Sequence, residues 1–454
     1  MNARMPMTGH ESGSETAQHI AVVGSGVSGL GAAWLLSQRH RVTLLEAQTR
    51  AGGHSHTVDV NRADGCSVPV DTGFIVYNEA TYPNLTALLA HLDVPTRETQ
   101  MSFAVSLDHG ALEYSGTDLG GLFAQRRRLV DPRFWRMLQD LVRFYRHAPA
   151  DAARLGRMTL DEYLGDRGYS SAFRQDHLYP MAAAIWSTPA AEIGRYPFDA
   201  FVRFCANHNL LKLTGRPPWR TVIGGSREYV RRIARALGSA VRLDSRVTRV
   251  ERDDWGVRLH TDAGVLPERF DQVVIAAHAD EALQLLDSPS PSERQLLGAF
   301  RYTQNRVLLH RDPGLMPRRQ RVWSSWNYLG ERDGTTPPCV SYWMNALQEL
   351  PADDPLFVTL NPPHEPQPGR VIREFSYAHP LFDQAALDAQ TQLWNLQGRR
   401  RTWFCGAYFG SGFHEDGLQA GLAVAEAIGG VRRPWAVADE SGRIHLARQA
   451  GVPA

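Results

Sequence analysis

Apolar and polar positions near the start of the chain alternate in the pattern of a β-α-β unit. Residues 20–23 form a short apolar run typical of a buried strand, and residues 28–38 have the spacing of a helix. Residues 41–45 form a second apolar run. Because these three segments follow one another closely, we expect two parallel strands joined by a crossover helix.

The same reading predicts further elements beyond residue 75. Two more helices are expected, one over residues 81–92 and one over 418–428, and a longer helix over 126–147 is interrupted near Pro132. The expected strands are 241–251, 256–261, 272–276, 357–360 and 402–405. The stretches between these elements are rich in aromatic residues and proline and have no clear period.

The regular segments predict an α/β fold with a discontinuous Rossmann-like domain. Its pieces are 19–75, 219–285 and 396–430, and an α+β substrate domain formed by 76–218 and 286–395 is inserted between them. We expect residues 1–18 to be a disordered tail and residues 431–454 a C-terminal tail. A length of 454 residues suits such a two-part enzyme.

Composition narrows the class of protein. The 49 Lys+Arg and 48 Asp+Glu nearly cancel, which argues against a nucleic-acid partner. The four cysteines have neither disulfide nor zinc spacing, so a reducing cytoplasm is expected and no metal is predicted. No apolar run reaches the 18 residues of a membrane span. Only one of the basic residues, Lys212, is a lysine.

A glycine-rich turn joins the first strand to the first helix. Gly24, Gly26 and Gly29 follow the pattern G-x-G-x-x-G, with Val27 and Ser28 at the start of the helix. Such glycines allow a tight turn, close approach to a pyrophosphate and close helix–strand packing, while the helix N-terminus attracts the anion. Glu46 follows the second strand, where an acid accepts hydrogen bonds from ribose hydroxyls. A dinucleotide ligand is therefore predicted.

Two later motifs resemble the flavin amine oxidase superfamily. The string Arg-Ala-Gly-Gly-His ends in Gly52, Gly53 and His54, and the string Val-Asp-Thr-Gly-Phe ends in Gly73 and Phe74. In that superfamily the glycine doublet passes close to the cofactor phosphates and the flavin, although an arginine usually stands where this chain has His54. The resemblance implies FAD as the cofactor and an FAD-binding domain of the amine-oxidase (GR2) type.

Two further segments extend the resemblance. Residues 245–250 are similar to a strand whose backbone binds the adenine, here at Val247. Residues 404–421 are similar to the C-terminal flavin segment, in which a helix N-terminus points at the N1–O2 edge of the isoalloxazine. This resemblance implies that Gly406, Asp416, Gly417 and Leu418 contact the cofactor.

The irregular blocks resemble a narrower group, the bacterial FAD-binding proteins that are often encoded beside cyclopropane-fatty-acid synthases. The strings AAAIWSTP, FCANHNLLKLTGRPPWRTVIGGSREYV and FCGAYFGSGFHEDGLQAG carry this resemblance. It implies an oxidoreductase of lipid metabolism that acts on unsaturated, methylated or cyclopropanated acyl chains, with a cyclopropane synthase as partner. An amine or amino-acid oxidase and a non-catalytic flavoprotein partner are the alternatives. The absence of lysine near residues 304–307, where amine oxidases often place one beside the flavin, argues against amine oxidation.

Candidate residues for chemistry come from the same blocks. His414, directly before the proposed flavin-binding helix, is the candidate catalytic base, and its neighbours Glu415 and Asp416 suit helix capping or cofactor binding. Desaturation needs such a base for the second hydrogen. The candidates for the substrate cavity are polar or aromatic: His208, Asn209, His310, Trp326, Tyr342 and Asn345. A second dinucleotide fingerprint is absent, so an external electron acceptor is required.

A basic amphipathic helix is predicted within residues 126–146. This segment contains seven Arg and two Asp, a local charge of +5 (7 − 2). Its apolar residues fall on one helical face: Phe134, Leu138, Leu141, Val142 and Tyr145. The helix suits either packing on the substrate domain with a solvated Arg face, or peripheral contact with the inner face of the membrane.

Overall fold

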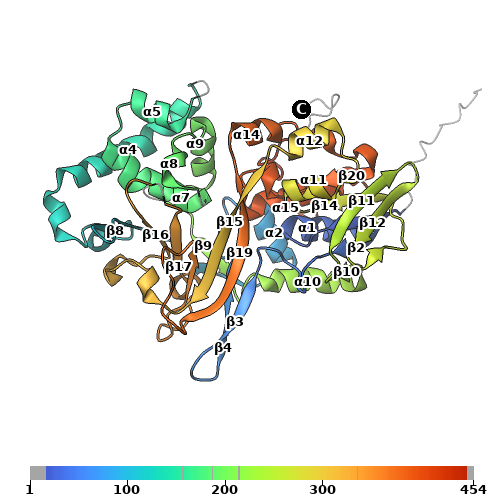
Figure 1. The fold of residues 1–454 in the computed structure, drawn as a ribbon, viewed down its shortest axis with the longest axis horizontal. Coiled ribbons are helices and arrows are strands. Elements are labelled where there is room, and N and C mark those ends of the chain that lie inside the picture. The colour runs from blue at the N-terminus through green and yellow to red at the C-terminus, as the bar shows by residue number, and fades with distance from the viewer. Residues whose placement is uncertain (1–16, 156–157, 187, 213–214, 335, 447–454) are drawn as a thin grey trace, which may run out of the picture.

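The computed structural model describes residues 17–155, 158–186, 188–212, 215–334 and 336–446. Most of the predicted N-terminal tail and residues 447–454 lie outside the described residues. In Figure 1 a sheet flanked by helices lies on one side of the molecule, and a second sheet with a helical cap lies on the other. The fold is a mixed α/β fold with these two parts.

A five-stranded parallel sheet in the order β10-β2-β1-β14-β20 organises the first part. Its strands are β1 (His19–Val23), β2 (Arg41–Leu45), β10 (Val241–Arg242), β14 (Gln272–Ile275) and β20 (Thr402–Phe404). The strands come from three separate stretches of the chain, as the Rossmann-like reading predicts. The central strands are almost entirely buried because helices cover the sheet.

Helices α1 (Val27–Leu36) and α15 (His414–Ile428) pack closely against each other beside this sheet (Figure 1). Their approach requires glycine: a Cβ on Gly421 of α15 would lie 2.1 Å from the Ser28 carbonyl oxygen of α1. Helix α15 begins four residues before the predicted start at 418. Helix α2 (Pro83–His91) packs on α15, and α10 (Arg227–Leu237) packs on α1.

Smaller sheets surround the parallel sheet. Strands β3 (Thr57–Asn61) and β4 (Ser67–Asp71) form a hairpin that projects from the molecule in Figure 1. The predicted strand 241–251 is divided, because its first residues join the parallel sheet as β10 and its last form β11 (Val247–Asp253). A three-stranded sheet contains β11, β12 (Gly256–Thr261) and β13 (Gly264–Val265), and another contains β5 (Tyr77–Asn78), β9 (Trp219–Val222) and β6 (Thr96–Thr99).

A seven-stranded sheet in the order β19-β15-β18-β17-β16-β7-β8 organises the second part. Its strands are β7 (Phe103–Leu107), β8 (Leu112–Ser115), β15 (Arg301–His310), β16 (Trp326–Gly330), β17 (Cys339–Trp343), β18 (Phe357–Leu360) and β19 (Val371–Leu381). Only β18 was expected from the pattern of apolar and polar residues. The other strands escape pattern reading because neither face of this sheet alternates cleanly between apolar and polar residues.

The helical cap over this sheet begins with the segment predicted as one interrupted helix. The structure has a 3₁₀ helix η1 (Arg126–Val130) and then α4 (Pro132–Ala152), with Asp131 capping α4 through Arg133 N. The short helix α3 (Leu119–Leu122) precedes them. Five further helices complete the cap: α5 (Leu160–Asp166), α6 (Ser171–Phe173), α7 (Tyr179–Trp186), α8 (Ala190–Ile193) and α9 (Phe198–Asn207).

The remaining short elements connect these layers. They are η2 (Arg174–Leu178), η3 (Gly238–Ala240), α11 (Ala279–Leu285), α12 (Pro291–Leu297), η4 (Pro313–Leu315), η5 (Gln320–Val322), α13 (Met344–Gln348), α14 (Gln384–Gln390), η6 (Leu393–Leu396), η7 (Arg399–Arg401) and η8 (Ala407–Phe409). Residues 431–446 do not behave as a tail. Arg433 is buried and binds Glu426 and Asn84, which fixes this segment to α15 and α2.

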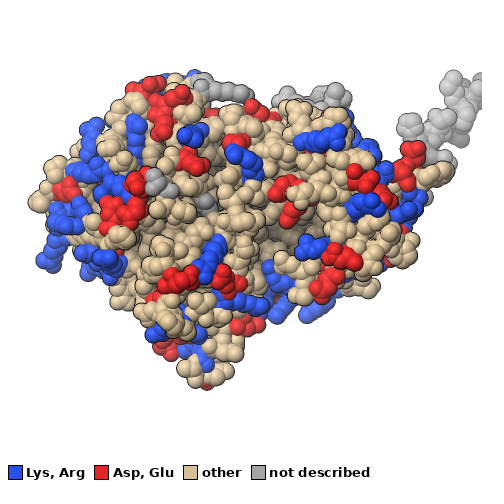
Figure 2. Space-filling model, in the orientation of Figure 1, with Lys and Arg blue, Asp and Glu red and all other residues tan. Residues whose placement is uncertain are grey.

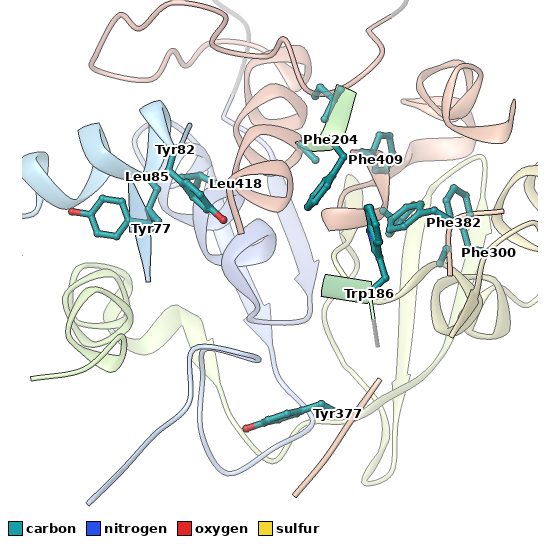
Figure 3. Packing of buried hydrophobic residues seen from close by; sticks show 14 of the residues in the cluster. Tyr77, Tyr82, Leu85, Trp186, Phe204, Phe300, Tyr377, Phe382, Phe409 and Leu418 are labelled. Atoms are coloured by element: carbon teal, nitrogen blue, oxygen red, sulfur yellow. The ribbon is translucent and has the colours of Figure 1, made fainter. Parts of the chain in front are cut away.

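One continuous apolar core joins the two parts. Figure 3 shows aromatic side chains from distant segments gathered at their junction, among them Trp186, Phe204 and Phe382. The rings of Trp186 and Phe204 lie 4.6 Å apart. The large parallel and mixed sheets are therefore held against each other by packed side chains, and the cavity described below lies at this junction.

Candidate cofactor and substrate cavity

A cavity of about 1660 Å³ runs from the carboxyl ends of β1, β2 and β14 into the space between the seven-stranded sheet and the helical cap. Ligand pockets usually measure roughly 300–1,000 Å³, so this cavity has room for more than one ligand. Its position at the ends of parallel strands is where nucleotides bind in α/β folds. We call its two halves the cofactor end and the substrate end.

The fingerprint glycines shape the cofactor end. Gly24 has φ +99°, and a Cβ on Gly29 would lie 1.9 Å from the Gly24 carbonyl oxygen, so both positions require glycine. Gly26 differs, because a Cβ there would meet no atom within 4 Å. Gly26 and Val27 line the cavity, so the room beside Gly26 is available to a ligand.

The N-terminus of α1 faces the cavity without an internal partner. Its N-cap Gly26 offers no side chain, and no acidic residue lies in the first turn. Val27 and Ser28 at this helix start both line the cavity. Free N–H groups and the positive end of the helix dipole make such a terminus an anion site.

Glu46 and Arg50 place opposite charges beside this helix. Glu46 accepts hydrogen bonds from the backbone N and the hydroxyl of Ser25, at 2.9 and 2.6 Å, and its other oxygen accepts from Gln48 N at 2.9 Å. Arg50 lies half-buried in the cavity wall, and its Nη1 has no hydrogen-bond partner among the described residues. Burial lowers the pKa of Arg50. Arg50 begins the Arg-Ala-Gly-Gly-His motif and was not predicted to bind the cofactor; its signal in the sequence is a cation four residues after Glu46.

The second glycine motif lies against the first. Gly53 has φ +54°, and its Cβ would lie 3.1 Å from Gly26 Cα. A Cβ on Gly73 would lie 2.3 Å from the His54 carbonyl oxygen. Gly53, His54, Gly73 and Phe74 line the cavity. Gly52 does not line the cavity. Its N–H donates to the carbonyl oxygen and the hydroxyl oxygen of Ser25, which anchors the glycine doublet to the fingerprint loop.

The predicted residues from later segments divide into two groups. Val247 and Gly406 line the cavity. Asp416, Gly417 and Leu418 do not line it, which corrects the expectation that they contact the cofactor. Asp416 accepts a hydrogen bond from Phe413 N and pairs with Arg443, and Leu418 packs toward Gly31 of α1. These residues hold the helix in place, whereas Phe413 and His414 of the same segment reach the cavity.

Glu415 is equally structural. Its carboxylate is fully buried and accepts hydrogen bonds from Asn84 N, Asn84 Nδ2, Leu85 N and Gln419 Nε2. Burial raises the pKa of Glu415 although these donors act in the opposite direction. The carboxylate therefore ties α15 to the start of α2.

A cluster of imidazoles surrounds His54. The ring of His54 lies 4.9 Å from Tyr377, 5.9 Å from His379 and 6.3 Å from His278. Burial lowers the pKa of His54 to about 3, and the neighbouring imidazoles act in the same direction. Burial also lowers the pKa of His379 to about 4, so His54 and His379 are neutral hydrogen-bonding groups at neutral pH. The sequence reading missed His278 and His379, because nothing in their local pattern connects them to His54.

His414 is fixed from two sides. Its ring stacks on Phe74 with centroids 3.8 Å apart, and its Nε2 lies 2.8 Å from the Tyr229 hydroxyl and 3.3 Å from the Ser55 hydroxyl. Burial lowers the pKa of His414 to about 3. The structure brings His414 into the cavity wall beside Phe74, but its Nε2 is already engaged by hydroxyl groups.

Four of the six substrate-cavity candidates line the cavity: His208, Asn209, Trp326 and Tyr342. His208 Nδ1 lies 3.0 Å from the Phe204 carbonyl oxygen, which fixes the proton on Nδ1. Its Nε2 is a buried acceptor without a partner among the described residues, and burial lowers the pKa of His208 to about 3.

The other two candidates lie outside the cavity, which corrects that expectation. His310 is fully buried within the sheet, with Nε2 2.7 Å from the Thr359 hydroxyl and Nδ1 accepting from Asp312 N. Asn345 binds the carbonyl groups of Pro351 and Asp354 and accepts from Leu356 N. Both side chains satisfy their own polar groups inside the protein, as buried polar groups usually do.

The substrate end is mainly apolar. Its walls carry Leu138 and Leu141 from α4, Met181 and Trp186 from α7, and further apolar residues from both sheets. Among the described residues, Glu46 and Glu281 are the only acids that line the cavity, and Glu46 lies at the cofactor end. Arg216 is the basic residue on the wall near Tyr145 and His177. Apart from Glu281, which is exposed at the start of α11, the described lining outside the cofactor end has no acid that would pair with a cation.

The cofactor end fits FAD. The open space beside Gly26, the uncapped helix N-terminus and the unpartnered Arg50 Nη1 suit a pyrophosphate, and Glu46 suits a ribose. The described residues contain no group of three or more His, Cys, Asp or Glu arranged to hold a metal ion. Among them there is also no helix long and apolar enough to cross a membrane.

Comparison with known families agrees with this geometry. The model of the family described as flavin containing amine oxidoreductase matches residues 27–309. A Mycobacterium tuberculosis relative, whose name describes a flavin-containing monoamine oxidase, is 28% identical over 304 residues. That alignment covers 63% of this chain and 63% of the relative, so the chain spans less than two thirds of the relative's length.

Solved structures show the same fold at low identity. A putrescine oxidase variant has a TM-score of 0.64 and 16% identity, covering 91% of this chain and 99% of that chain. The CLA-producing fatty acid isomerase from P. acnes has a TM-score of 0.61 and 15% identity, covering 90% of this chain and 98% of that chain. At these low sequence identities the comparison shows a shared fold and not a shared substrate.

Proposed function

Because the chain belongs to the flavin containing amine oxidoreductase family, whose cofactor is FAD, we propose that it is an FAD-dependent oxidoreductase acting on a lipid acyl chain. The observation that carries the choice of substrate is the apolar substrate end of the cavity, whose described walls offer aliphatic and aromatic side chains and no acid near the inner part. An acyl chain gains free energy by leaving water for such a site, about 0.8 kcal/mol for each buried CH₂.

FAD would supply the capacity to take a hydride from a substrate C–H bond, with an external acceptor needed for turnover. The residues proposed to hold FAD are Gly24 and Gly26 with the α1 N-terminus for the pyrophosphate, and Glu46 for the adenosine ribose. Gly29 does not line the cavity, which corrects the expectation that it binds the cofactor, and instead lets α1 pack closely on Gly24. Arg50 adds positive charge beside the phosphates. Gly53, His54, Gly73 and Phe74 line the wall between the two ends of the cavity.

The protein must also orient the acyl chain and accept a proton if a second hydrogen leaves. Leu138, Leu141 and Trp186 offer apolar contacts that would align the chain. Two neutral imidazoles, His414 and His208, are the candidate proton acceptors. His208 has the uncommitted Nε2, whereas His414 would first have to release a hydroxyl partner. Arg216 at the wall suits an acidic head group such as a carboxylate.

Amine oxidation is the second candidate function, and the family name and the names of the relatives favour it. Two features of this chain count against amine oxidation. Among the described residues, the inner substrate end has no acid that would pair with an ammonium group. On β15 the cavity wall carries Gln304, which accepts a hydrogen bond from the Ser376 hydroxyl, where an amine oxidase often has a lysine. The chain's one lysine, Lys212, is exposed.

The fatty acid isomerase shares this fold, so the fold is compatible with an acyl substrate. On the resemblance of the irregular sequence blocks we extend the proposal to a role beside a cyclopropane synthase. The test is lipid analysis by mass spectrometry of host cells that lack the gene, carry it, or carry a Gly26→Val variant designed to exclude the cofactor. We expect an altered acyl profile only with the wild-type gene. Identical profiles in all three strains would contradict a role on acyl chains. Co-purification with the synthase without flavin reduction by any acyl compound would favour a flavoprotein that assists its partner without turnover.

A further inference from the structure

Exposed apolar residues gather where the helical cap begins. Leu119 of α3, Leu129 and Val130 of η1, and Trp135 of α4 are 76%, 51%, 83% and 44% exposed. We call these four residues the apolar tip. They belong together, because Trp135 Nε1 donates to the Leu129 carbonyl oxygen at 2.9 Å and the rings of Trp135 and Phe123 lie 5.6 Å apart. Contiguous apolar surface of this kind marks an interaction site.

Arginines without acidic partners border the apolar tip. Within the described part of the chain, the guanidinium groups of Arg126, Arg127 and Arg321 make no ion pair; Arg127 and Arg321 donate only to the carbonyl groups of Ala111 and Gly120. The two nearby acids are engaged, since Asp118 caps α3 and Asp131 caps α4 and pairs with Arg128. Figure 2 shows Lys and Arg side chains along the edge of the molecule that carries α4 in Figure 1. The tip is therefore apolar at its centre and positive around it.

The helical face predicted to meet a membrane is not this tip. Phe134 and Tyr145 of α4 are buried, and Leu138 and Leu141 line the cavity, so the amphipathic face turns inward. Only Val142 of that face is exposed. The packing interpretation is thus right for the body of α4, and the candidate contact surface moves to its N-terminal end.

The cavity reaches the surface beside the tip. Gly116 and Thr117 line the cavity and are exposed, and they precede α3 directly. Leu119 of α3 is exposed and Leu122, three residues later, lines the cavity, so the apolar tip and the cavity wall are one helical turn apart. A chain that entered here would pass Leu138 and Leu141 on its way to the cofactor end.

We infer that the apolar tip docks on an anionic lipid bilayer, with its apolar side chains in the acyl boundary and Arg126, Arg127 and Arg321 against the head groups. Trp and aliphatic side chains surrounded by arginine match the chemistry of that boundary. The opening at Gly116 and Thr117 would then face the bilayer. Docking itself is independent of turnover, and only the delivery of an acyl chain to the cavity rests on the proposed function.

The test is co-sedimentation of the FAD-loaded full chain with vesicles of phosphatidylcholine alone or with phosphatidylglycerol added. We expect binding to the mixed vesicles and little binding to the neutral ones. The paired change Leu129→Ser with Trp135→Ser, and the paired change Arg126→Ser with Arg127→Ser, should each weaken binding by roughly tenfold or more. Bound FAD and the melting temperature confirm that each variant is folded.

The matched control is Trp255→Ser with Arg258→Ser. Trp255 is 83% exposed and Arg258 is exposed, and they lie on the β11–β12 sheet at the opposite end of the long axis from α4 (Figure 1). We expect this variant to bind like the wild type. Absence of wild-type binding to anionic vesicles, or an equal loss in the control variant, would overturn the inference. Tip-dependent binding without flavin reduction by any acyl lipid would leave docking in place and contradict the proposed substrate instead.

Discussion

The two ends of the cavity are lined by different parts of the chain. The cofactor end consists of backbone and glycine from short, local motifs, such as Gly24 to Gly29 and Gly52 to Gly53. The substrate end consists of side chains from segments as distant as Met101 and Phe382. A site formed by backbone and glycine can be recognised from a short sequence motif, whereas a wall of side chains from distant segments cannot.

The largest expected effect comes from filling the room beside Gly26. In Gly26→Val the new side chain meets no protein atom within 4 Å of its Cβ, so the fold should remain intact while the pyrophosphate is displaced from the α1 N-terminus. We expect FAD affinity to fall by more than about 100-fold. Absorbance of bound flavin and the melting temperature of the apoprotein measure the two effects separately.

The matched control for that variant is Gly165→Val. Gly165 is an exposed residue of α5, and its Cβ would likewise meet no atom within 4 Å. It should retain FAD. If Gly26→Val retained FAD as well, the space beside Gly26 would not be the cofactor's, and the division of the cavity into two ends would fail.

FAD affinity should also depend on the negative charge of Glu46. Glu46→Gln keeps the shape but removes the charge that strengthens hydrogen bonds to ribose hydroxyls, so FAD affinity should fall roughly 10- to 100-fold. Titration of the apoprotein with FAD, followed by flavin fluorescence, gives the affinity. Glu281→Gln, the other acid in the wall, should change it little because Glu281 is exposed at the start of α11. Equal losses in both variants would remove the special role of Glu46.

The substrate end is tested by a single larger side chain. Leu141→Trp fills part of the cavity wall, and if it displaces two methylene groups of an acyl chain, substrate affinity should fall about tenfold. Val142→Trp, one position along α4 and outside the cavity, should behave like the wild type. The half-saturating acyl concentration for flavin reduction is the measurement, and the flavin spectrum should be unchanged in both. A change in FAD affinity instead would show that the two ends are not separate.

The smallest effect concerns the buried imidazole at the substrate end. The pKa of His208 is lowered to about 3 by burial, so the folded state holds fewer protons than the unfolded state between pH 3 and 6.5. Neutral His208 therefore favours the folded state fully above pH 6.5. Below that pH the free energy of unfolding falls, by at most about 1.4 kcal/mol per pH unit for this one group. His208→Gln should therefore flatten the fall in melting temperature between pH 7 and pH 5. The exposed His147→Gln should leave that profile unchanged, and an unchanged profile in His208→Gln would contradict the buried neutral state.

The contrast between the ends also explains what the sequence could predict. The β1–α1–β2 unit, the fingerprint glycines and Glu46 were predictable because strand period, turn chemistry and helix start coincide within 27 residues. The family resemblance added Val247 and Gly406, and both line the cavity. The long strands β15 and β19 were missed, since both faces carry polar residues and their pairing joins segments about 70 positions apart.

Errors at the site have a common physical cause. Asp416, Asn345 and His310 have the residue types that bind ligands, but each satisfies its hydrogen bonds within the protein. Sequence alone does not distinguish a polar side chain that stabilises the fold from one that faces a cavity. Conversely, His278 and His379 meet His54 only through tertiary structure, so no local signal identifies them.

The most direct test of the central claim is anaerobic reduction of the FAD-loaded protein, followed by the loss of flavin absorbance. A panel of fatty acids and phospholipids with unsaturated, methylated and cyclopropane chains is compared with a panel of mono- and polyamines. We expect flavin bleaching by at least one acyl compound and none by the amines, with slower bleaching in Leu141→Trp than in Val142→Trp. Rapid bleaching by an amine and none by any acyl compound would contradict it and would make the chain an amine oxidase.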